Sequence, residues 1–162
     1  MEQYIGTKMI NATPMTRGEY NSLRNWVVPD DEDPTDLGYL VEYLDGGKPN
    51  LQGYDGYVSW SPMEQFELAY RPTTGLPFGL AIEALKKGLK VARTGWNGKG
   101  MWLFLVAGST FKVNRAPLNQ FYPDGTEINY CPHIDMKTAD DKVVPWLASQ
   151  TDMLADDWQI VD

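Results

Sequence analysis

A segment near the middle of the chain, Arg71-Pro72-Thr73-Thr74-Gly75-Leu76-Pro77, limits what this sequence can fold into. Its two prolines lack backbone N–H donors, so no regular helix or central strand is expected to run through it. The 162 residues are enough for one average domain or two small ones. We therefore predict two domains, one over residues 1–72 and one over residues 77–162.

The negative charge of the chain is concentrated in the first of these domains. The whole chain has 14 Lys and Arg against 22 Asp and Glu, a net charge of −8. Residues 1–75 hold 12 of the acidic residues and 5 of the basic ones, which leaves the remainder nearly neutral. A surface that binds nucleic acid needs an excess of Lys and Arg, so we expect no DNA or RNA partner.

Few residues in the chain can bind a metal ion or form a cross-link. Cys131 is the only cysteine and His133 the only histidine, which excludes an intrachain disulfide framework and a structural zinc site. The acidic run from Pro29 to Pro34 lacks the spacing of a calcium loop and is interpreted as a solvated loop. No apolar run approaches the roughly 18 to 20 residues that span a bilayer. We expect no metal, no cofactor and no membrane partner, and a soluble, cytoplasmic protein.

The first domain has the pattern of a small sheet with one or two short helices. Three strand-like pieces are bounded by turn residues: 4–10, 38–44 and 56–60. Ser61, Pro62 and Glu64 are the residue types preferred at the N-cap, first and third positions of a helix, which predicts a helix through about Tyr70. The sequence therefore predicts a small N-terminal α+β domain.

The second domain opens with a helix and continues with strands. Apolar residues recur at helical spacing from Phe78 to Leu89, and Gly88 suits a C-terminal cap. Four strand-like pieces follow: 90–93, 101–106, about 127–136 and 158–161. The predicted fold class is α+β, with a small, mainly antiparallel sheet and one leading helix.

The loop from Gly95 to Gly100 combines groups that suit a nucleotide. Trp96 offers an aromatic face, Asn97 an amide and Lys99 an ammonium, beside three glycines that let a ligand approach the backbone. The loop lacks the Gly-Lys-Ser/Thr ending of a phosphate-binding P-loop. The alternative is a hairpin in which Trp96 only covers the core.

A second polar cluster surrounds the only histidine. Asn129, Cys131, His133 and Asp135 share one face if their segment stays extended, although Pro132 breaks the register of a strand. His133 and Asp135 are candidates for an acid–base pair, but Cys131 is the only nucleophile near them. The alternative is a polar strand face that is hydrogen-bonded to neighbouring strands.

A third cluster lies near the C-terminus. Ser149 and Asp152 are spaced as in a capping box at a helix start. The free amides of such a start favour an anion or a ribose oxygen. Capping alone also explains the pair.

Long stretches of the second domain resemble the second type of phage Thoeris anti-defence protein. The stretches are Phe78–Gly88, Val91–Met101, Pro132–Met136 and Val144–Trp158. They occur in the family's order over residues 77–162, and the family's Arg-x-Gly-Trp motif is present as Arg93-Thr94-Gly95-Trp96. Residues 1–72 look like a small domain of other phage proteins and are an addition to the shorter family members.

The resemblance implies a sponge rather than an enzyme. Such a protein binds glycocyclic ADP-ribose, the cyclic ADP-ribose isomer of Thoeris immunity, and withholds it without cleaving it. Some relatives also take up cyclic dinucleotides such as cGAMP, the signals of CBASS immunity. The family assembles as homotetramers with ligand pockets between subunits, in the cytoplasm of the infected bacterial host. No catalytic residues are expected.

The resemblance also implies roles for individual residues. We expect Trp96 to stack on a base and Phe78 to add apolar contact. Arg93 and Lys99 are expected to face the pyrophosphate. The remaining candidates are hydrogen-bonding groups: Asn97, Asn129 and His133, and, for the ribose hydroxyls, Ser149, Thr151 and Asp152.

Two other functions remain open at this point. A cyclic-nucleotide phosphodiesterase would use His133 as base and Asp135 to orient it. An acidic mimic of nucleic acid would use the charge of residues 1–75 to block a host DNA-binding protein. The 7 Tyr and 2 Trp of residues 1–72 suggest a further hypothesis, that the added domain reinforces assembly or rims the pocket.

Overall fold

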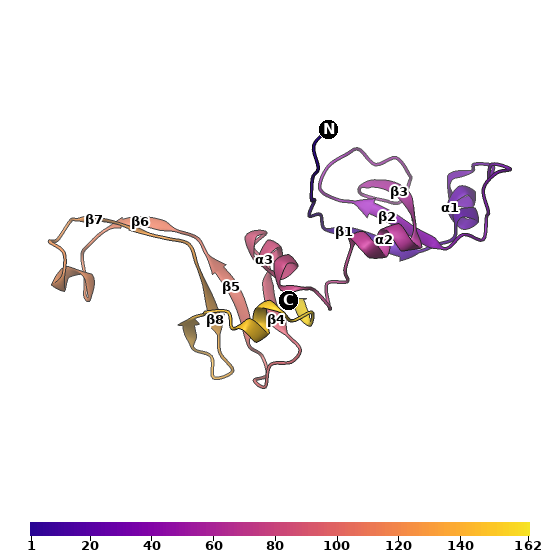
Figure 1. Ribbon diagram of the computed structural model, residues 1–162. Helices are drawn as coiled ribbons and strands as arrows, with labels where there is room; N and C mark the ends of the chain where they lie inside the picture. Colours follow the sequence, from indigo (N-terminus) through magenta and orange to yellow (C-terminus); the bar gives the residue numbers. More distant parts are fainter. The chain divides into compact units, whose positions relative to one another are not determined.

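The computed structural model describes all 162 residues, which form two compact units, Met1–Arg71 and Pro72–Asp162 (Figure 1). The boundary between the units lies in the proline-containing segment that interrupts the sequence pattern. Every strand pair in both units is antiparallel. The predicted α+β class with mainly antiparallel sheets is confirmed.

The first unit contains a three-stranded sheet in the order β1-β2-β3. Its elements are β1 (Ile10–Pro14), α1 (Arg17–Arg24), β2 (Gly38–Tyr43), β3 (Tyr57–Pro62) and α2 (Met63–Ala69). The strand predicted at residues 4–10 is wrong in position, because only Ile10 of that stretch pairs with β2. The core of the unit is formed by Tyr20, Leu40 and Val58.

Sequence analysis predicted no position for one helix of the first unit and a wrong N-cap for the other. Helix α1 was not predicted, although Thr16 and Glu19 form a complete capping box at its start. Helix α2 begins after Pro62 without a side-chain cap, and Ser61 still pairs with Tyr39 in the sheet. The predicted Ser61 cap is therefore wrong, because sheet pairing holds this residue in the preceding strand.

The second unit contains a five-stranded sheet in the order β10-β4-β5-β8-β9, with one helix packed on one face. Its elements are α3 (Phe78–Lys86), β4 (Lys90–Arg93), β5 (Trp102–Val106), β8 (His133–Lys137), β9 (Val143–Pro145), α4 (Gln150–Met153) and β10 (Trp158–Val161). The leading helix is confirmed, and Gly88 adopts the left-handed φ of 82° that ends it. Ala81 and Leu85 of α3 pack on the core with Val91, Leu103 and Trp158 from the sheet.

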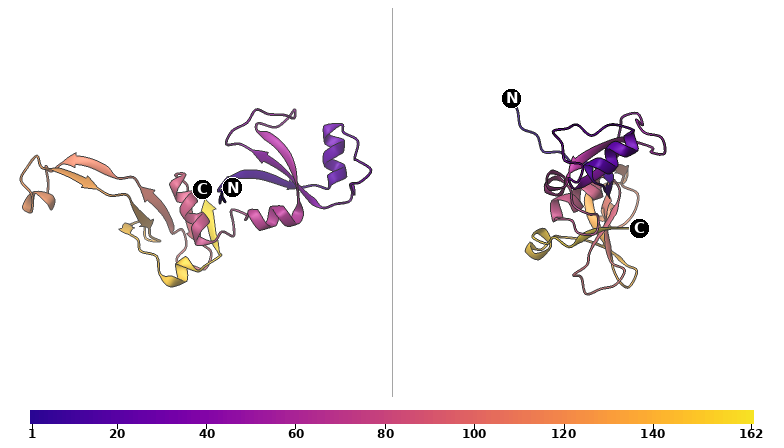
Figure 2. Two further views of the ribbon diagram at one scale, coloured as in Figure 1. Left: turned by 45° about the horizontal axis from the view of Figure 1, so that its top comes forward. Right: turned by 90° about the vertical axis from the view of Figure 1, so that its right-hand side faces the viewer.

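A two-stranded ribbon extends from the sheet of the second unit. Strands β6 (Ser109–Lys112) and β7 (Glu127–Tyr130) pair with each other, and the short helix η1 (Leu118–Gln120) lies between them. We call residues 107–132 the arm; it continues from β5 and β8 in both Figure 1 and Figure 2. The single strand predicted at about 127–136 is wrong, because Cys131 and Pro132 separate β7 from β8.

Candidate functional site

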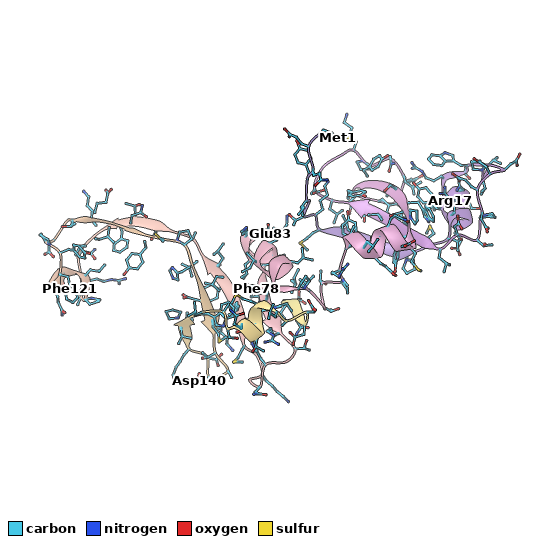
Figure 3. The ribbon with its side chains drawn as sticks, in the orientation of Figure 1. Met1, Arg17, Phe78, Glu83, Phe121 and Asp140 are labelled. Carbon is cyan, nitrogen blue, oxygen red and sulfur yellow. The ribbon has the colours of Figure 1, made fainter.

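An aromatic cluster lies where the end of β4, the start of α3 and the C-terminal segment meet. Trp158 is completely buried at its centre. The ring centroids of Trp96, Phe78 and Trp146 lie 5.4, 5.5 and 5.9 Å from that of Trp158. Phe78 stands at the start of α3, next to α4 (Figure 3). Trp96 is half-buried in this cluster, so it covers the core as the alternative interpretation of its loop expected.

A buried carboxylate, Asp152, joins this cluster to helix α4. One oxygen, Oδ2, accepts hydrogen bonds from Ser149 N at 3.0 Å and Ser149 Oγ at 2.6 Å, which completes the predicted capping box. The other, Oδ1, accepts from Arg93 Nη1 at 2.9 Å and Trp96 Nε1 at 3.3 Å. Burial opposes the ionisation of Asp152, but these hydrogen bonds outweigh it and lower its pKa to about 2.

Asp157 holds the turn that leads into the Gly95–Gly100 loop. Its Oδ1 accepts from Arg93 Nε at 2.8 Å, and its Oδ2 accepts from the Gly95 backbone N–H at 2.7 Å. Its backbone oxygen accepts from both the N–H and the hydroxyl of Thr94, at 3.1 and 2.9 Å. A Cβ at Gly95 would lie 2.8 Å from Asp157 Oδ2, so a side chain at this position would push the carboxylate away from the Gly95 N–H. The hydrogen bond from Arg93 and that from Gly95 lower the pKa of Asp157.

The Arg93 guanidinium is therefore bound between two carboxylates of its own chain. Its side chain is 13% exposed, and the hydrogen bonds to Asp157 and Asp152 raise its pKa. This arrangement fixes the turn, and it leaves fewer guanidinium donors for the pyrophosphate that Arg93 was expected to face. Sequence analysis missed Asp157, because it lies 64 residues from Arg93 and no local pattern links the two.

Three of the predicted site residues are exposed around this cluster. Asn97 and Lys99 lie in the loop that follows the Arg93–Gly95 turn, and Thr151 lies on α4. None of the three side chains is engaged in a hydrogen bond or an ion pair. These groups are therefore available to a ligand that approaches the loop.

The two other predicted residues, Asn129 and His133, lie apart from the aromatic cluster, on β7 and β8. His133 Nδ1 lies 3.1 Å from the backbone oxygen of Cys131. His133 Nε2 lies 3.7 Å from Asp135 Oδ2, which is too long for a hydrogen bond. The expected acid–base pair is therefore not joined by a hydrogen bond.

His133 also lines a pocket of about 490 Å³ that runs along the arm from His133 to Leu118. Phe111 and Tyr130 stack in its wall, with ring centroids 5.4 Å apart and an interplanar angle of 29°. Arg115 lines the same pocket, and its side chain makes no ion pair. Sequence analysis missed these three residues, because only the pairing of β6 with β7 brings them together.

No group of three or more His, Cys, Asp or Glu side chains is arranged to hold a metal ion. None of the helices has both the length and the apolar character needed to cross a membrane.

Comparison with known proteins identifies the class of the second unit. Residues 76–161 match the family model of the Thoeris anti-defense 2-like domain, which is more than half of the chain. The chain therefore belongs to the Thoeris anti-defense 2-like family, and the resemblance found in the sequence is confirmed. It is similar to the protein named Thoeris anti-defense 2 from Bacillus phage SP01, with 46% identity over 92 residues. That match covers 54% of this chain and 97% of the phage relative.

Proposed function

We propose that this protein is a phage anti-defence protein that binds glycocyclic ADP-ribose and withholds it from the effector of Thoeris immunity. The observation that carries the proposal is that the match to the anti-defence family extends over nearly the whole second unit, residues 76–161. The same unit supplies the chemistry that a cyclic nucleotide needs, which is aromatic faces for bases and cations for phosphates.

The pocket along the arm supports binding of such a ligand. It pairs the stacked rings of Phe111 and Tyr130 with the cationic side chain of Arg115 and the imidazole of His133. Its volume of about 490 Å³ falls within the range of about 300 to 1,000 Å³ typical of small-molecule sites. The exposed Asn97 and Lys99 offer a second set of polar groups on the loop that Asp157 fixes.

Sequestration is favoured over cleavage by the geometry around His133. Hydrolysis needs a base, an orienting group and a nucleophile within hydrogen-bonding reach of one another. The His133 Nε2 to Asp135 Oδ2 distance of 3.7 Å does not provide this, and His133 Nδ1 faces the backbone oxygen of Cys131. A sponge requires only that the ligand is held.

Assembly into a homo-oligomer, a tetramer, is part of the proposal. The strand register puts Trp102, Phe104 and Asp135 on the sheet face opposite α3. Trp102 and Phe104 are only partly buried there in the single chain, and a second copy packed on this face would cover them. A partner would also cover the arm, where Phe121 is 75% exposed (Figure 3). Residues that are distant in one chain could then share a ligand.

The proposal is tested by capture and release. The purified protein is incubated with glycocyclic ADP-ribose, freed of unbound ligand, denatured by heat, and the supernatant is analysed by mass spectrometry. We expect intact ligand. Cleavage of the ligand by the wild type, and no cleavage by a His133→Ala variant, would establish the phosphodiesterase instead. Failure of the wild type to retain any ligand would exclude the sponge.

Variants on the arm localise the binding. Arg115→Ala is expected to reduce retention, because it removes the cation that lines the pocket. Lys112→Ala is the matched control, since Lys112 lies on the same arm outside the pocket lining. Repeating the assay with cGAMP tests whether cyclic dinucleotides are also bound. Equal retention by both variants and the wild type would place the ligand elsewhere.

A further inference from the structure

A second concave site lies in the Met1–Arg71 unit, outside the matched family domain. It is a groove of about 470 Å³ bounded by α1, the segment before β2, the end of β3 and the start of α2. Leu37, Trp60, Pro62 and Met63 supply its apolar lining. Leu37 is 60% exposed, so its side chain is part of the surface of the groove and not of the core.

The tryptophan of the groove is held firmly in place. Trp60 Nε1 donates a hydrogen bond to the Met15 backbone oxygen at 2.8 Å. A Cβ at Gly38 would overlap the Trp60 ring, so the absence of a side chain there lets the indole lie against β2. The Arg17 guanidinium lies 4.4 Å from the Trp60 ring centroid (Arg17 is labelled in Figure 3). The apolar surface is therefore formed before any ligand binds.

The polar lining of the groove is mainly negative. Arg17 is its only cation, and Arg17 Nη1 already pairs with Glu32 Oε2 at 2.6 Å. Asp36, Glu64 and Glu67 contribute three carboxylates. Glu67 accepts a hydrogen bond from Tyr39, whereas the Asp36 and Glu64 side chains make neither a hydrogen bond nor an ion pair. These two charges have no partner in the chain.

We propose that this groove docks a basic segment of a partner protein. A Lys or Arg side chain would lie along the groove with its charge at Asp36 and Glu64 and its methylene stem against Pro62 and Met63, beside the Trp60 ring that Arg17 covers. A neighbouring apolar side chain would contact Leu37. The excess of acidic residues in residues 1–75 would steer a basic partner toward the unit.

The groove gives the Met1–Arg71 unit a recognition role that does not depend on the ligand of the second unit. It also differs from mimicry of nucleic acid. A mimic needs only diffuse negative charge, whereas the groove combines two specific carboxylates with a fixed indole. Substitutions inside and outside the groove therefore separate the two.

The test uses the full-length chain and a fluorescent synthetic peptide of alternating lysine and leucine as the probe. A peptide with glutamate in place of lysine is the control probe. The groove variant is Asp36→Asn with Glu64→Gln, which removes no hydrogen bond of the fold. The matched control is Asp30→Asn with Asp31→Asn, an equal change of charge at exposed positions outside the groove.

We expect the wild type to bind the basic peptide only. The groove variant should lose about tenfold in affinity and the control variant less than about twofold, because only the groove carboxylates contact the probe. The NMR signal of the Trp60 indole N–H, assigned with Trp60→Phe, should shift on binding. An equal loss in both variants, an unshifted Trp60 signal, binding of spermidine as tight as that of the peptide, or no binding to the wild type would each overturn the proposal.

Discussion

Arg93 Nε donates a hydrogen bond to Asp157 Oδ1 at 2.8 Å, and this contact joins β4 to the residue that precedes β10. The same carboxylate accepts from the Gly95 backbone, so one side chain fixes both the cation and the turn behind it. Because Trp96, Asn97 and Lys99 follow directly, the position of the candidate loop depends on a residue far away in the sequence.

Replacing Asp157 should therefore destabilise the second unit and displace the Gly95–Gly100 loop. In Asp157→Ala, we expect a loss of about 2 kcal/mol in the free energy of unfolding, because the Arg93 and Gly95 donors lose their acceptor. That corresponds to a drop of roughly 8 to 16 °C in the melting temperature of the second unit. Retention of glycocyclic ADP-ribose should fall as well. Asp156→Ala is the control, since the Asp156 side chain is exposed and unbonded. Equal melting temperatures for the two variants would contradict the prediction.

Stability of the second unit should decrease in acid through Asp152. Its pKa is about 2 in the folded chain, against an ordinary value of 3.8. As the pH falls, the unfolded chain therefore takes up the proton first. The stability contributed by ionised Asp152 is present above about pH 4 and is lost as the pH falls toward 2.

This prediction is checked by thermal unfolding between pH 2 and 6 in the wild type and in Asp152→Asn. Other carboxylates of this unit with lowered pKa values, Asp157 and Asp140, add to the acid dependence, so the difference between the two proteins is the informative quantity. The variant should be less stable at pH 6 and show a flatter profile. Parallel profiles of stability against pH in the two proteins would mean that Asp152 does not cause the loss of stability in acid.

Two substitutions separate the packing of Trp96 from its contact with a ligand. Trp96→Ala should cost roughly 2 kcal/mol in stability, because the indole packs on Trp146 and Trp158. If Trp96 stacks on a base, this variant should also lose roughly ten- to hundredfold in affinity. Trp96→Phe keeps an aromatic face and loses the hydrogen bond to Asp152 and part of the indole packing. Calorimetry with glycocyclic ADP-ribose should show near wild-type affinity for the phenylalanine variant. Unchanged affinity in a folded alanine variant would remove Trp96 from the site.

A charge on the sheet face opposite α3 should prevent assembly. In Phe104→Glu, the new carboxylate would be buried in the proposed contact between copies, directly opposite Asp135 in the strand register, at a cost of several kcal/mol. Sedimentation should then report a monomer instead of a tetramer. Ala139→Glu, in the exposed turn between β8 and β9, should leave the mass unchanged. A wild-type monomer at working concentrations would refute the assembly itself.

The features that sequence analysis predicted well are local ones. The helix from Phe78 and the capping pair Ser149 and Asp152 depend on residues a few positions apart, so their spacing is visible in the chain. The strand at 127–136 was misjudged because its two halves pair with different partners, β6 and β5. The contact of Arg93 with Asp157 and the pocket around Arg115 arise only from tertiary pairing, which no local pattern contains.

The arm has a consequence for how the protein exchanges its amide protons. Strands β6 and β7 have only each other as partners, and a two-stranded ribbon is marginally stable in water. Amides of the arm should therefore exchange through local opening, orders of magnitude faster than those of β4 and β5, which open only with the whole sheet. Slow amide exchange in the arm would indicate that a partner is bound to it.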